Sequence, residues 1–108
     1  MPEPHELRMV IKTFDGALRL FGRGGTHWVN GPPQSPDNYC VLTALARATT
    51  SLKGERDRDA FRSACMFLRR AIWPRRNIVR WNDARERTWQ EVRVAFLKAR
   101  TLAERELQ

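Results

Sequence analysis

Hydrophobic residues recur at helical spacing in the first stretch of the chain, from about Glu3 to Phe21. Its apolar residues fall on one face of a 3.6-residue period, namely Leu7, Val10, Ile11, Phe14, Leu18 and Phe21. Gly16 weakens this helix by about 1 kcal/mol relative to alanine. Three glycines at positions 22, 24 and 25 end it.

Two further stretches with the same period predict a second and a third helix. The second begins near Ser35 or Asp37, with an apolar stripe of Cys40, Val41, Ala44, Leu45 and Ala48. A turn at positions 53–55 leads into the third, which runs from about Glu55 to Ile72 with acidic residues in its first turns. Pro74 stops it, and its apolar face carries Phe61, Ala64, Cys65, Leu68 and Ile72.

The last helix has the clearest local signal. Thr88 and Glu91 stand at the spacing of a capping box, in which each side chain accepts a hydrogen bond from the other residue's backbone amide. One face then carries Val92, Ala95, Phe96, Ala99 and Ala103. The four helices predict an all-α, compact four-helix domain over residues 1–108.

Two connections separate these helices. The one between the first and second helix, from Arg23 to Asp37, is long and rich in glycine and proline. Trp28 and Val29 are expected to pin it, and a short strand at His27–Asn30 is one interpretation of its centre. The other connection runs from Arg75 to Arg87.

Composition and charge narrow the class of protein. The 108 residues carry a formal net charge of +8, and seventeen of the twenty basic residues are arginine. No apolar run approaches the ~18 residues that a membrane helix needs, and the first residues do not resemble a secretory signal. We therefore expect a cytoplasmic protein with Cys40 and Cys65 as free thiols, and neither a membrane protein, a large enzyme nor a disulfide-rich secreted scaffold.

The basic residues are concentrated in one segment. Residues 69–82 contain five arginines and no acid, with Trp73 and Trp81 between them. Arg58 and Arg62 project from the third helix within about 40° of Arg69. Such a patch attracts phosphates and can stack on bases. The predicted contact surface comprises Arg58, Arg62, Arg69, Arg70, Trp73, Arg75, Arg76 and Arg80.

Four short motifs complete the pattern: Trp28-x-x-Gly31, Cys40-x-x-x-Ala44-Leu45, Trp81-Asn82-Asp83, and Arg87-Thr88-x-x-Glu91-Val92. In this order, over roughly residues 17–103, they resemble a family of small uncharacterised bacterial and phage proteins. The chain departs from that family at Asn30, where glutamine is common, and at Thr43, where glycine is common. The resemblance implies a small helical fold and an origin in a phage or mobile element, and it implies no activity.

We interpret these motifs first as structural. Trp81 is expected to dock its connection onto the core, and Asn82 or Asp83 to cap a short turn before the last helix. Arg87 is expected to pair with Asp83 or Glu91.

Catalytic and metal chemistry are weaker alternatives. Cys40, at a predicted helix start, could be the nucleophile of a hydrolase, with His27 or His5 as base and Asn82 or Asp83 to orient it. His5, His27, Cys40 and Cys65 lack the paired spacing of a zinc site, and we expect neither a metal nor a cofactor. The glycine-rich segment at 22–25 follows a helix rather than a strand, so we interpret it as helix termination and not as a phosphate loop.

These observations favour a non-enzymatic protein that works by binding an anionic partner. The resemblance makes it a phage or mobile-element accessory protein, for example an inhibitor of a host nucleoprotein defence complex. A direct nucleic-acid-binding module is the second hypothesis, and the Cys40-dependent hydrolase is the third.

Overall fold

The computed structural model describes residues 2–52 and 57–108, and the regular secondary structure of this part of the chain is helical, with no sheet. Its α-helices are α1 (Pro4–Phe21), α2 (Val41–Thr50), α3 (Asp57–Ala71), α4 (Ile78–Asp83) and α5 (Trp89–Leu107), and a 3-10 turn, η1 (Arg23–Gly25), follows α1. The all-α class is confirmed, with a short fifth helix, α4, added to the four that the sequence predicts.

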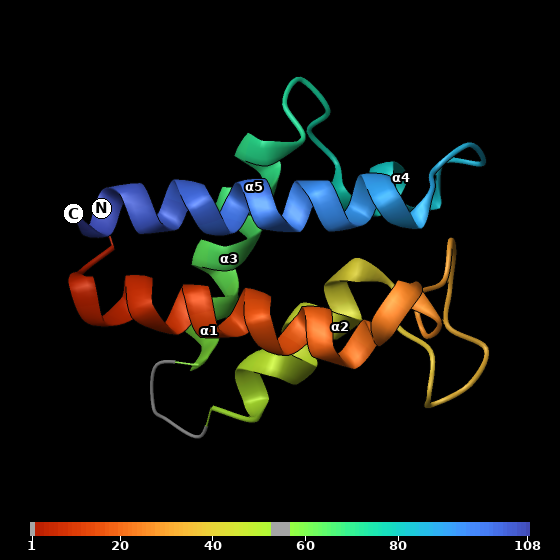
Figure 1. Ribbon diagram of the computed structural model, residues 1–108, viewed down its shortest axis with the longest axis horizontal. Helices are drawn as coiled ribbons and strands as arrows, with labels where there is room; N and C mark the ends of the chain where they lie inside the picture. Colours follow the sequence, from red (N-terminus) through yellow and green to blue (C-terminus); the bar gives the residue numbers. More distant parts are fainter. Residues whose placement is uncertain (1, 53–56) are drawn as a thin grey trace.

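The long helices α1 and α5 lie side by side and antiparallel, and α3 passes behind them (Figure 1). Phe96 of α5 makes edge-to-face contacts with Phe14 and Phe21 of α1, with ring centroids 5.5 Å apart in both pairs. Such aromatic pairs add stabilisation beyond the area they bury. These contacts join α1 to α5 in the core, which also contains fully buried side chains of α2 and α3.

The predicted apolar faces enter this core with a few changes. All five predicted positions of α5 are buried, and the capping box of Thr88 and Glu91 is present. In α1, Ile11 and Leu18 are only half buried, because the core face turns toward Ala17 and Thr13 instead. Phe67 of α3 is fully buried although it lies off the predicted stripe, since α3 packs against α1, α2, α4 and α5.

The predicted start of the second helix is wrong. The Ser35 carbonyl accepts a hydrogen bond from Asn38 N (3.1 Å), and the Ser35 hydroxyl accepts one from Asp37 N (3.2 Å). These residues therefore form a turn. Tyr39 is then extended, and α2 begins only at Val41 with Cys40 as its N-cap. Cys40 therefore stands outside the helical stripe that the spacing assigned to it.

The possible short strand at His27–Asn30 is not present: the structure describes these residues and they form no strand. Within residues 2–52 and 57–108 there is one isolated parallel bridge, between Trp28 and Tyr39, with Tyr39 N donating to His27 O (2.8 Å) and Val29 N to Tyr39 O (3.0 Å). These two hydrogen bonds join a residue just before α2 to the first part of the long connection.

Close packing of α1 on α2 occurs at Gly16. A Cβ placed on Gly16 would lie 3.2 Å from the Cβ of Ala48, closer than ordinary contact. The glycine that weakens α1 locally therefore lets the two helices approach. Thr43, where the chain departs from the resembled family, is exposed, so its side chain does not hinder this approach.

Two predicted features at the start of the third helix, the turn at 53–55 and the charge of Glu55, lie outside the described residues. Over the described ranges, no helix is both long enough and apolar enough to cross a membrane.

Candidate functional site

The predicted contact surface is assembled where α3 ends and α4 begins. After Ala71 the chain turns, with Trp73 N donating to Arg70 O (3.3 Å) and Arg75 N to Ile72 O (3.0 Å). Asn77 then caps α4 by accepting a hydrogen bond from Arg80 N (3.0 Å). This short reversal brings arginines of α3, the turn and α4 to one corner of the molecule.

Two adjacent hollows mark this corner. One, of about 320 Å³, is lined by Met66, Arg69, Arg70, Trp73, Arg75 and Arg76. The other, of about 220 Å³, is lined by Leu42, Arg69, Arg76, Asn77, Ile78 and Val79. Arg69 and Arg76 line both, so the two hollows form one continuous surface. We define the α3–α4 basic surface as the residues that line either hollow, plus Arg80, which lines neither but donates a hydrogen bond from its backbone amide to Asn77 beside the second hollow.

The electrostatics of this surface are unbalanced. Within residues 2–52 and 57–108, the guanidinium groups of Arg69, Arg75, Arg76 and Arg80 have no carboxylate within ion-pair distance. Trp73 is 65% exposed, and the guanidinium carbon of Arg76 lies 5.5 Å from its ring centroid. An exposed indole beside arginines that have no ion-pair partner among the described residues is suited to an anionic partner with flat or apolar groups.

Three predicted arginines lie at the margin of this surface or outside it. Arg70 lines one hollow but pairs with Glu106 at 2.9 Å, so its charge is largely compensated. Arg58 and Arg62 are exposed but line neither hollow. Eleven residues along a helix place Arg58 about 16 Å from Arg69.

Of the two residues predicted to cap a turn before the last helix, Asn82 does not do so, and the prediction is wrong for this residue. It lies inside α4, is 1% exposed, and uses its whole amide. Its Oδ1 accepts from Trp28 Nε1 (2.9 Å) and from Val41 N (3.2 Å), while its Nδ2 donates to Val29 O (3.1 Å) and Asp83 Oδ1 (2.9 Å). The residue joins the long connection, the start of α2 and α4.

The rest of this motif is also structural. Trp81 is buried as predicted, and the Arg87 guanidinium lies over its ring at 4.6 Å while donating to Trp81 O (2.8 Å). Arg87 pairs with Glu91 (3.0 Å), which confirms one of its two expected partners. The amide of Thr88, with Arg87 nearby, lowers the pKa of the Glu91 carboxyl. Gly31 has φ of 137°, which only glycine adopts readily.

The two cysteines are free thiols, as expected. Cys65 is packed in the core, and burial raises the pKa of its thiol despite the opposing charge of Arg69. Cys40 receives a hydrogen bond from the Thr43 hydroxyl at 3.3 Å. Neither histidine is hydrogen bonded to Cys40 in the described part of the chain, and the amide of Asn82 is fully engaged elsewhere.

The metal site considered from the sequence has no geometric counterpart in what the structure describes. Residues 2–52 and 57–108 bring no three His, Cys, Asp or Glu side chains together in a way that could hold a metal ion.

A family model described as a family of unknown function (DUF6197) matches residues 9–102. The chain belongs to this family. No curated protein and no solved structure matches the chain. The match spans the α3–α4 basic surface of this DUF6197 chain and all four sequence motifs, and it confirms the resemblance to an uncharacterised family.

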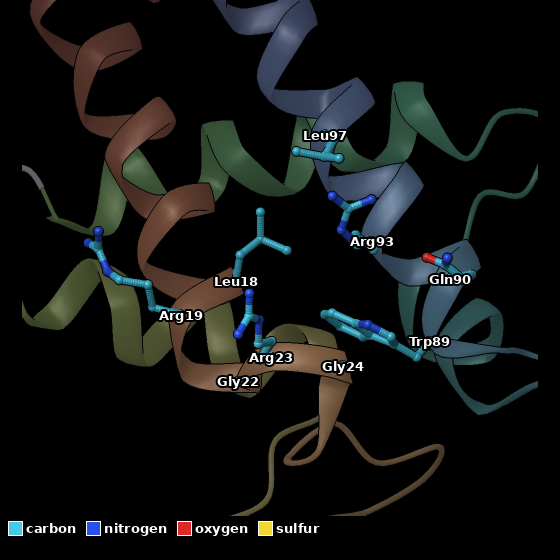
Figure 2. A pocket seen from close by; sticks show the side chains of 9 residues that line it. All are labelled: Leu18, Arg19, Gly22, Arg23, Gly24, Trp89, Gln90, Arg93 and Leu97. Carbon is cyan, nitrogen blue, oxygen red and sulfur yellow. The ribbon is translucent and has the colours of Figure 1, made fainter.

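One feature of this DUF6197 chain was missed by sequence reasoning. A hollow of about 740 Å³ lies between the end of α1 and the beginning of α5, lined by Leu18, Arg19, Gly22, Arg23, Gly24, Trp89, Gln90, Arg93 and Leu97 (Figure 2). We call it the α1–α5 hollow. The glycine-rich segment was interpreted only as helix termination, and Trp89 only as part of the capping sequence. Their meeting depends on the antiparallel packing of two helices from opposite ends of the chain.

Proposed function

We propose that this protein is a non-enzymatic binding protein that docks its α3–α4 basic surface on an anionic macromolecule. The observation that carries the proposal is the exposed indole of Trp73 among arginines with no ion-pair partner in the described residues. Tryptophan and arginine are the residues most often found at the energetic centre of interfaces. A partner that covers this surface removes the indole from water and supplies the missing negative charge.

Arginine favours partners whose anions are flat or branched. Its planar guanidinium binds carboxylate or phosphate through two parallel hydrogen bonds, and it stacks on aromatic faces. Arg76 is already held against Trp73, so part of the ordering that binding requires is present before the partner arrives. The finer hypothesis is that the partner is a host nucleoprotein, such as a defence complex, and that the protein is an accessory of a phage or mobile element. The resemblance to phage proteins supports this origin.

The test is a matched pair of charge reversals. Arg75, Arg76 and Arg80 are replaced by glutamate in one variant. Arg8, Arg85 and Lys98, which are exposed elsewhere, are replaced in the control. Both variants change the net charge equally, so only the position of the charge differs. The tagged proteins are used to capture partners from a host lysate, and circular dichroism checks that each variant is folded.

We expect the wild type and the control to retain the same anionic partner and the Arg75, Arg76 and Arg80 variant to lose it. Equal retention by both triple variants would contradict the proposal. Nuclease treatment before capture then identifies the partner, because a nucleic acid is lost and an acidic protein is kept.

Direct nucleic-acid binding is the second candidate, favoured by the exposed face of Trp73, on which a base can stack. It predicts that log affinity for a DNA duplex falls with log salt at a slope of ~0.9 per phosphate contacted. A protein-directed binder instead shows weak DNA affinity at physiological salt and a tight complex with its partner.

A further inference from the structure

The α1–α5 hollow has the composition of a ligand site rather than of an ordinary groove between helices. Arginines project from both helices, while Leu18 and Leu97 supply apolar walls. Its volume of about 740 Å³ lies in the range of small-molecule sites, roughly 300–1,000 Å³. No acidic side chain lines it, and Arg23 and Arg93 have no ion-pair partner within residues 2–52 and 57–108.

Trp89 is the fixed wall of the hollow. Its ring makes an edge contact with Phe21, with centroids 5.3 Å apart. Gly25 lies against the indole so closely that an added Cβ would come within 2.2 Å of the ring, and its φ is 70°. Only glycine fits there, so the chain holds the indole in one position.

The cations and the indole are arranged around one space. In Figure 2, Arg23 from the turn after α1 lies beside Leu18, Arg93 lies along α5 below Leu97, and the Trp89 ring lies between the turn and α5 at one end of the hollow. Arg19 also lines the hollow, but its side chain points away from Trp89 in this view. The space therefore offers two guanidinium groups and one aromatic surface to the same ligand.

We propose that the α1–α5 hollow binds a nucleotide unit, with the phosphate on Arg23 and Arg93 and the base stacked on Trp89. The two guanidinium groups bind phosphate oxygens through charge-assisted hydrogen bonds. Stacking on an aromatic side chain accepts any base, because every base has a π face. Leu18 and Leu97 cover the apolar edges of the sugar and base. The nucleotide comes either free or within a single strand, and this site is independent of the α3–α4 basic surface.

The test measures affinity for AMP, adenosine, ribose 5-phosphate and a short single-stranded oligoadenylate by calorimetry at low salt. We expect AMP or the oligonucleotide to bind at least about tenfold more tightly than adenosine or ribose 5-phosphate, since each fragment lacks one of the two contacts. Binding of AMP supports the free nucleotide as a ligand. Binding of the oligonucleotide alone supports a nucleotide within a strand. Failure of both, or equal binding of ribose 5-phosphate, overturns the proposal.

Matched variants locate the site. The Arg23→Gln, Arg93→Gln double variant changes exposed side chains only, and we expect it to lose about tenfold or more in affinity. The Arg8→Gln, Arg85→Gln variant removes the same charge at exposed positions that line neither the hollow nor the α3–α4 basic surface, and it should keep the wild-type affinity. Retention of affinity in the Arg23, Arg93 variant, with loss in an Arg75→Gln, Arg76→Gln variant, would assign nucleotide binding to the α3–α4 basic surface and overturn this inference.

Tryptophan fluorescence provides an independent readout. Nucleotide should quench part of the emission of the wild type and of Trp73→Phe. It should have no such effect on Trp89→Phe, in which the ring contact with Phe21 is largely kept. Quenching that survives in Trp89→Phe overturns the placement of the base. The charge reversals at Arg75, Arg76 and Arg80 described above should leave this quenching unchanged. Either proposal can therefore be refuted without refuting the other.

Discussion

Asn82 should contribute more to stability than any other polar side chain of the described chain, because it joins three segments through one buried amide. Replacement by alanine removes the acceptor for Trp28 Nε1 and for Val41 N and the donor to Val29 O. The Val41 amide is buried, and an unsatisfied buried group costs about 1–3 kcal/mol. The other two partners are partly buried and can gain water, so they cost less. We expect a total loss of about 2–5 kcal/mol.

This loss is a large fraction of the roughly 5–15 kcal/mol that stabilises a domain. It should be measured by urea unfolding, where it lowers the midpoint by roughly 1–3 M. The matched control is Asn77→Ala, which removes only the exposed N-cap of α4 and should cost about 1 kcal/mol. If Asn82→Ala were no more destabilising than Asn77→Ala, the reasoning would be refuted.

Asn82→Asp separates hydrogen bonding from packing. The aspartate keeps the shape and the acceptor for Trp28 and Val41, but it turns a second oxygen toward Val29 O and the Asp83 carboxyl. Repulsion raises the pKa of the new carboxyl in the folded state above its unfolded value. The stability deficit relative to wild type should therefore grow as pH rises through that raised pKa and shrink toward pH 4. A deficit that does not change with pH would point to packing alone.

Three further outcomes follow from other contacts. The pKa of Glu91 is lowered in the fold by the Thr88 amide and Arg87, so its stabilising contribution is present above the ordinary carboxyl pKa and is lost as pH falls through the lowered value. The free energies of unfolding of wild type and Glu91→Gln, measured from pH 7 to pH 3, should therefore converge in acid, and a constant difference would contradict this. Iodoacetamide should label the half-exposed Cys40 in the native protein and the buried Cys65 only in urea, because burial excludes the reagent and raises the pKa of the Cys65 thiol. Mass spectrometry reads the labelling, and equal labelling rates of the two cysteines in the native protein would disprove this. Gly16→Val should lower the free energy of unfolding by about 1–3 kcal/mol, because the added side chain meets Ala48. The control Lys12→Val, at an exposed position one turn earlier, should lower it by about a few tenths of a kcal/mol, and equal losses would show that the helices do not pack tightly at Gly16.

The sequence by itself determined the elements whose signals lie within a few turns of one helix. The five apolar positions of α5 and its capping box were predicted residue by residue, because both depend on side chains three or four residues apart. The concentration of arginine around Trp73 was likewise visible in the sequence. Its exposure was not, since an indole at that spacing could equally belong to the core.

Only the tertiary structure decided the features that join distant segments. The start of α2 depends on the Trp28–Tyr39 bridge and on Asn82, which is 41 residues from the Val41 amide it accepts from. The six residues of α4 are too few for a periodic pattern to stand out. The α1–α5 hollow unites Arg23 with Trp89 and Arg93, and no local rule relates residues so far apart. Helix periodicity is a property of neighbouring residues, whereas a binding site is a property of the surfaces that packing brings together.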